Sequence, residues 1–127
     1  PAMAVSSVVK VDYEVRGCPM TQQDFLKLLI ALVLGKQPPK YGSPVCVECK
    51  LKENECLYNR GMVCLGPITR GGCDAVCPSF GQFCTGCRGI LDDPNLDGML
   101  DLMTSHGISL DEAKKRMLLY NSNEVQL

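Results

Sequence analysis

The sequence lacks several features that mark common classes of protein. It has no tryptophan and a single histidine. Its most apolar run, residues 25–34, contains Lys27 and is well short of the roughly 20 residues that a membrane-spanning helix needs. Thirteen basic and 14 acidic residues give a net charge of −1, which offers no basic surface to nucleic acid or an anionic membrane. The chain opens without the basic and apolar regions of a secretory signal. We therefore expect a cytoplasmic protein that has no membrane span and does not bind nucleic acid.

Cysteine, by contrast, is abundant. Nine cysteines occur among 127 residues, and an odd number leaves one of them without a disulfide partner. One cysteine, Cys18, stands alone, and the other eight divide by position into two sets of four. The first cysteine set consists of Cys46, Cys49, Cys56 and Cys64, and the second cysteine set consists of Cys73, Cys77, Cys84 and Cys87.

The pattern of residues predicts two domains, 1–40 and 41–127. In the first, alternating apolar and charged residues over 9–15 predict a short strand, and Thr21 can begin a helix that Gly35 ends. In the second, the cysteine-rich stretch lacks sustained periodicity and predicts loops, followed by helices near 96–106 and 110–120. The predicted fold class is helical and irregular: three to four helices, a short N-terminal strand, and a small cysteine-rich domain whose loops surround two metal sites.

Each cysteine set could surround one zinc ion or one iron–sulfur cluster with four thiolates, or could form disulfides. Each set has one tight Cys-x-x-Cys pair and two dispersed cysteines, whereas zinc sites usually combine two tight pairs or add histidines. The only histidine, His106, lies outside both sets. Pro78 follows Cys77, as proline follows the last ligand of a ferredoxin run, and glycines crowd the ligands. Iron–sulfur binding is favoured, but zinc and disulfides stay open on spacing alone.

Four linked motifs occur in order: "GCPM", "VCVEC", "ECLYNRGMVCLGPITRGGCDAVCPS" and "CTGCRG". Together they resemble the C-terminal half of a nickel–iron hydrogenase small subunit of the cytosolic type, similar to the viologen-reducing and sulfhydrogenase branches. The resemblance covers residues 8–120. That family carries three clusters in a row, which pass electrons between the nickel–iron centre of the large subunit and an outside partner.

The resemblance implies a ligand assignment. The first cysteine set resembles the ligands of the distal cluster, the second set those of the medial cluster, and Cys18 the last ligand of the proximal cluster. Respiratory members have histidine where this chain has Cys46, and proline where it has Cys77. All-cysteine ligation implies 4Fe-4S clusters at both sites and a lower potential than an imidazole ligand gives. The family's N-terminal flavodoxin-like domain, which supplies the other proximal ligands, is not in this sequence, so we expect a piece of a longer subunit.

The predicted function is therefore that of an electron-transfer subunit, itself non-catalytic, of a nickel–iron hydrogenase. Its cofactors would be two 4Fe-4S clusters within the chain and a third that Cys18 helps to bind. Its partners would be the hydrogenase large subunit and an electron-accepting iron–sulfur or flavin subunit. No residue is a candidate for bond-making chemistry. Two alternatives are a stand-alone iron–sulfur electron carrier and a zinc-stabilised binding module.

Overall fold

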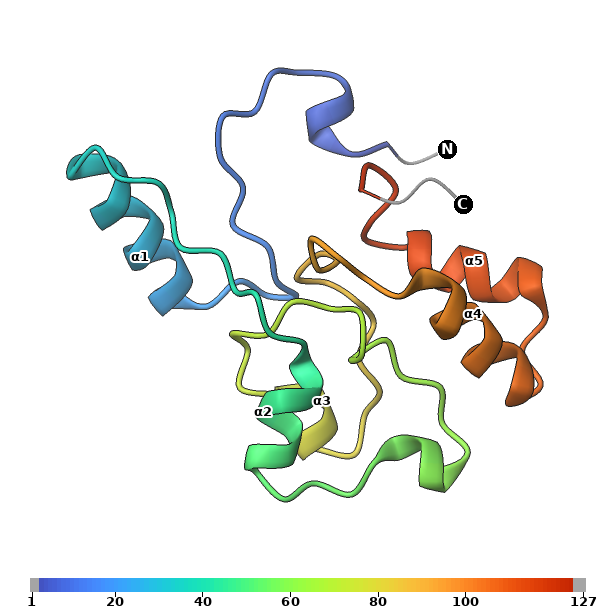
Figure 1. Cartoon of the computed structure of the whole chain (residues 1–127). Coiled ribbons are helices and arrows are strands. Elements are labelled where there is room, and N and C mark those ends of the chain that lie inside the picture. Colours follow the sequence, from blue (N-terminus) through green and yellow to red (C-terminus); the bar gives the residue numbers. More distant parts are fainter. Residues whose placement is uncertain (1–2, 125–127) are drawn as a thin grey trace. The chain divides into compact units, whose positions relative to one another are not determined.

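The structure is a computed structural model that describes residues 3–124, and it is mostly helical and irregular (Figure 1). The predicted fold class of a small cysteine-rich domain of helices and loops is confirmed. The chain divides between Lys40 and Tyr41 into two compact units. No helix within residues 3–124 is long and apolar enough to cross a membrane.

The first unit differs from the prediction at its start. The strand predicted over 9–15 is wrong: a short 3-10 helix, η1 (Val5–Ser7), is followed by irregular backbone. An alternating pattern forms a strand only where a neighbouring strand takes up its hydrogen bonds. Here the apolar side chains of that pattern are well exposed, with Val9 at 53% and Tyr13 at 45%.

The predicted helix after Thr21 is confirmed as α1 (Gln22–Val33). The Thr21 hydroxyl accepts a hydrogen bond from the Asp24 N–H at 3.1 Å, and Gly35, with a φ of 63°, ends the helix. Of the described residues of α1, only Ala31 is buried, and apolar side chains such as Phe25 and Ile30 are about half exposed. The helix is thus formed by its local signals rather than by burial within its unit.

The cysteine-rich stretch of the second unit is not made of loops alone. It contains α2 (Val45–Leu51), the 3-10 helix η2 (Leu57–Arg60) and α3 (Val76–Ser79). Two isolated antiparallel bridges, Pro44 with Arg70 and Thr69 with Ile90, connect its loops. These elements are too short for a hydrophobic period to show in the sequence.

The two predicted C-terminal helices are confirmed as α4 (Leu96–Ser105) and α5 (Leu110–Leu118), which pack against each other (Figure 1). Asn95 caps α4 by accepting from the Gly98 N–H at 2.8 Å, and Ser109 caps α5 by accepting from the Glu112 N–H at 3.3 Å. The buried side chains of these helices join those of the segments before and after the second cysteine set in one core: Val63, Leu65, Ile68, Ile90, Met99, Met103, Ala113 and Met117.

A second buried cluster contains cysteines. It consists of Val45, Leu57, Cys64, Ala75 and Cys84, with Cys49 and Cys73 packed against it. Two buried clusters therefore lie in the second unit, and one of them is built around members of both cysteine sets.

Candidate metal centres

The first cysteine set is brought together by three short segments. α2 carries Cys46 and Cys49 one turn apart, Cys56 is the residue before η2, and Cys64 follows the turn at Gly61, which has a φ of 69°. Val45 anchors α2, because its side chain is 1% exposed and its N–H donates to the Thr69 carbonyl at 2.9 Å.

All four cysteines of the first set line one cavity with a volume of about 60 Å³. Apolar side chains and Lys50 complete its wall. Within residues 3–124 no three histidine, cysteine, aspartate or glutamate side chains are placed to hold a single metal ion. The four sulfurs of this set surround a space.

Gly66 leaves room for two of these sulfurs. A Cβ at this position would lie 3.2 Å from the Cys46 Sγ and 3.4 Å from the Cys64 Sγ. The Gly66 N–H also forms a hydrogen bond to the Cys64 sulfur. Glycine thus leaves the clearance that a Cβ would reduce, and its N–H reaches a ligand sulfur.

Burial makes these thiols hard to ionise without a cation. It is the main cause that raises the pKa of Cys46 to about 11, with further contributions from Cys64, Cys49 and Cys56, while Lys50 lowers it. Burial also raises the pKa of Cys64, against the hydrogen bonds from the Cys84 and Gly66 N–H groups. Since each thiolate repels the others, four of them together need positive charge in the cavity, and thiolates bind iron and zinc strongly. The donor set fits a thiolate-bound metal centre.

The second cysteine set is carried mostly by loops. Cys77 is half-buried in α3, and Cys84 is buried beside Cys87, whose charge is among the causes that raise the Cys84 pKa. Burial is the largest cause and brings the pKa of Cys84 to about 12, while hydrogen bonds with the Gly86 N–H and the Thr69 hydroxyl lower it. The Cys73 sulfur receives a hydrogen bond from the Val76 N–H. Backbone donors thus reach at least two sulfurs of this set.

A backbone hydrogen bond connects the two sets directly. The Cys84 N–H donates to the Cys64 Sγ at 3.2 Å, and the Leu65 N–H donates to the Cys84 carbonyl at 2.9 Å. The segments that carry Cys64 and Cys84 therefore lie side by side. In contrast, Cys18 belongs to the first unit, where it is exposed.

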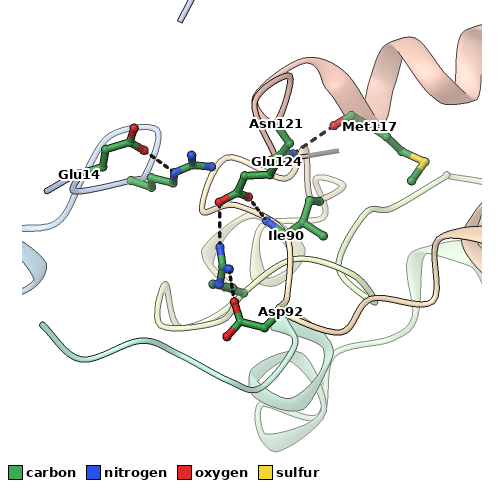
Figure 2. Close-up of polar contacts among 8 residues, drawn as sticks. Glu14, Ile90, Asp92, Met117, Asn121 and Glu124 are labelled. Carbon is green, nitrogen blue, oxygen red and sulfur yellow. Dashed lines mark hydrogen bonds and ion pairs between the residues drawn. The ribbon is translucent and has the colours of Figure 1, made fainter. Parts of the chain in front are cut away.

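The C-terminal residues support the loop of the second set. The Glu124 carboxylate accepts from the Ile90 N–H at 2.8 Å and pairs with Arg70, which also pairs with Asp92 (Figure 2). The buried Asn121 side chain donates to the Met117 carbonyl and lies 3.0 Å from where a Cβ of Gly86 would be.

Several residues of the site could not be assigned from the sequence. Thr69 is 15 positions from Cys84, and Asn121 and Glu124 are more than 30 positions from Gly86 and Ile90, which they contact, so no local motif marks them. Arg88, which directly follows Cys87 in the sequence, is 9% exposed. Its Nε donates to the Gly71 carbonyl at 2.9 Å, and its guanidinium lies 5.2 Å from the centre of the Tyr41 ring. Its position next to Cys87 is the sequence signal that distinguishes Arg88 from the other charged residues of the loops.

Comparison with known proteins supports the resemblance. No protein-family model matches the chain. The chain is 44% identical over 100 residues to sulfhydrogenase 2 subunit delta of Pyrococcus furiosus, a match that covers 78% of this chain and 42% of the relative. It is 35% identical over 131 residues to a vhu-type F420-non-reducing hydrogenase subunit of Methanococcus voltae, covering 89% of this chain and 45% of the relative. It is 31% identical over 136 residues to the F420-non-reducing hydrogenase iron-sulfur subunit of Archaeoglobus profundus, covering 85% and 42%.

All three relatives are named as hydrogenase subunits, as the four motifs predict. The chain spans a little under half of their length. In sequence, therefore, the chain is a relative of sulfhydrogenase and F420-non-reducing hydrogenase subunits, one of which is named as an iron–sulfur subunit.

Proposed function

We propose that the chain is a non-catalytic electron-transfer part of a nickel–iron hydrogenase, which relays electrons between a large-subunit active site and a redox partner. The observation that carries this proposal is the cavity lined by the four thiols of the first cysteine set, whose Cys64 sulfur is hydrogen-bonded to Cys84 of the second. The relatives, which are named as hydrogenase subunits and in one case as an iron–sulfur subunit, support the reaction class.

Each set would hold one 4Fe-4S cluster, the first as the distal and the second as the medial centre. Such a cluster supplies one-electron redox chemistry when it is bound. The chain's own residues bind it through four thiolates, exclude water with side chains such as Val45 and Leu57, and direct N–H groups at the ligand sulfurs. Cys18 would contribute one ligand to a third, proximal cluster whose other ligands come from outside this chain.

The medial assignment is tested by the substitution Cys77→Pro. Loss of one thiolate from the second set should convert one 4Fe-4S centre to a three-iron cluster of higher potential, while the other centre keeps its spectrum. EPR spectroscopy with redox titration measures both. Unchanged spectra and potentials in this variant would show that Cys77 is not a ligand.

The relay role is tested by isolating the chain anaerobically from cells that also produce the other subunits of its proposed complex. A complex that contains a nickel-bearing large subunit and an electron-accepting iron–sulfur or flavin subunit is expected. A chain that is loaded with clusters yet is isolated without a nickel-containing partner would favour the stand-alone electron carrier instead.

A further inference from the structure

Glu48 lies in α2 between two cysteines of the first set, but its carboxylate contacts the loop of the second. Its Oε1 accepts a hydrogen bond from the Gly72 N–H, and its Oε2 accepts one from the Ala75 N–H at 3.0 Å. The same Oε2 lies 3.9 Å from the Cys73 Sγ. One side chain of α2 therefore holds both ends of the short loop that presents Cys73.

That loop has a backbone conformation that needs outside support. Asp74 and Ala75 have φ values of 59° and 46°, in the left-handed region that residues with a Cβ rarely adopt, and Gly72 has a φ of 97°. Left-handed backbone costs free energy and persists where the surroundings hold it in place. In this shape the loop turns two N–H groups toward one anion, which is the form of a backbone anion nest.

The fit around the carboxylate is close, and a second contact from the α2 region strengthens it. A Cβ at Gly71 would lie 3.0 Å from the Glu48 Oε1, so glycine is what lets the backbone approach. Lys52, directly after α2, forms an ion pair with Asp74 at 2.6 Å. The helix that carries Cys46 and Cys49 is thereby joined to the loop that carries Cys73.

Charges of opposite sign act on Cys73. The Glu48 Oε2 lies 3.9 Å from the Cys73 Sγ, and the positively charged Arg88 directly follows Cys87 of the same set. A metal-bound cysteine is a thiolate, and a carboxylate about 4 Å away opposes any further negative charge on the centre. Adding an electron to that centre is therefore less favourable with Glu48 ionised than without it.

We propose that Glu48 is a positioning residue for the second cysteine set: its carboxylate fixes the loop that presents Cys73, and its negative charge lowers the reduction potential of the cluster bound there. This inference rests on the proposed function, because it requires a redox cluster at that set. Glu48 couples the geometry of the two cysteine sets, so α2, which carries two cysteines of the first set, also determines the environment of the second centre.

The test compares Glu48→Gln with Glu53→Gln in the full chain, made anaerobically with ferrous iron and sulfide. Both variants lose one negative charge, but Glu53 is exposed. Redox titration followed by EPR measures both midpoint potentials, and Cys77→Pro identifies the signal of the second set. We expect Glu48→Gln to shift the potential of the second centre upward and that of the first centre less, while Glu53→Gln leaves both unchanged.

Glu48→Asp separates the two parts of the inference, because it keeps the charge but is too short to reach both N–H groups. It should lower the occupancy of the second centre, with the low potential retained in the chains that still bind it. If Glu48→Gln instead loses the second centre alone, with about half of the iron gone, the positioning role is supported. Loss of both centres together, or potentials equal to those of Glu53→Gln, would overturn it. An unsubstituted chain that binds no iron would overturn the proposed function itself, a result distinct from either.

Discussion

The first cysteine set is gathered by short helical segments around one cavity, whereas the second is carried mainly by loop backbone. Around the first set the neighbours are apolar side chains, one lysine and the N–H groups of Gly66 and Cys84, which both reach the Cys64 sulfur. Around the second they are N–H groups, the Thr69 hydroxyl, the Glu48 carboxylate and the Arg88 guanidinium. Backbone donors serve both sets, so the difference lies in the side chains: those around the first set are mainly apolar, and those around the second include a hydroxyl and charges of both signs.

The largest expected effect comes from removing one thiolate from either set. Cys49→Ser and Cys87→Ser should each lose at least one iron, and at most the cluster of its own set, because a hydroxyl is a poorer iron ligand than a thiolate and each set holds its own cluster. Iron analysis and EPR should show that a different signal is lost in each variant. Complete loss of iron from both variants would show that the two sets do not bind metal independently.

In the metal-free, reduced chain, the loss of stability with rising pH should be larger for the buried Cys84 of the second set than for Cys46 of the first. Burial raises the pKa of Cys84 from 9.0 to about 12 and, together with neighbouring cysteines, that of Cys46 to about 11. Folding therefore favours the neutral thiols, and their stabilisation is complete below pH 9 and is lost between pH 9 and the folded values. Between pH 9 and pH 11 the free energy of unfolding should fall by roughly 2 kcal/mol for Cys84 alone.

Urea unfolding at several pH values measures this loss. Cys84→Ser should flatten the pH profile more than Cys46→Ser, because the Cys84 pKa is raised further and serine does not titrate in this range. Equal slopes in the unsubstituted chain and in Cys84→Ser would contradict the burial of that thiol.

A smaller and local effect is expected from Gly66→Ala. Its Cβ would come within 3.2 Å of the Cys46 Sγ, so the occupancy of the first set should fall while that of the second is retained. Gly42→Ala is the matched control, since nothing lies within 4 Å of its added Cβ. Iron content and the EPR signal of each centre measure the outcome, and an equal loss from both sets would contradict the packing account.

The smallest expected effect is that of Arg88→Gln on the potential of the second centre. Removing this positive charge should make reduction harder and lower that potential, opposite in sign to Glu48→Gln, whereas Arg88→Lys should change it less. Redox titration with EPR measures both variants. If the potential of the first centre shifted instead, the Arg88 guanidinium would have to lie nearer to the first cysteine set, which would contradict the structure.

The parts of the fold that the sequence predicts are those set by local rules. The side chains of Thr21, Asn95 and Ser109 each cap the start of a helix by accepting a hydrogen bond from a backbone N–H. A helix cap can be identified from a few adjacent residues in the sequence. The strand predicted over 9–15 was wrong, because alternation shows only that a segment could pair and the pairing partner is not a local property.

The grouping of the cysteines into sets was predicted from their spacing, but most of their supporting residues were not. Cys46, Cys49, Cys56 and Cys64 line one cavity, as close sequence positions allow. Glu48 stands between two of these cysteines, yet its partners Gly72 and Ala75 are 24 and 27 positions away. Nothing in its neighbourhood distinguishes it from a solvated charge, since the contact depends on how two distant segments pack.

We propose above that each cysteine set holds one 4Fe-4S cluster. This proposal is tested most directly by iron and acid-labile sulfide analysis of the anaerobically prepared chain, together with its visible and EPR spectra. We expect a brown protein with about eight iron and eight sulfide per chain and EPR signals of two centres after reduction. A colourless protein with two zinc ions per chain would contradict the claim and would favour a zinc-stabilised binding module.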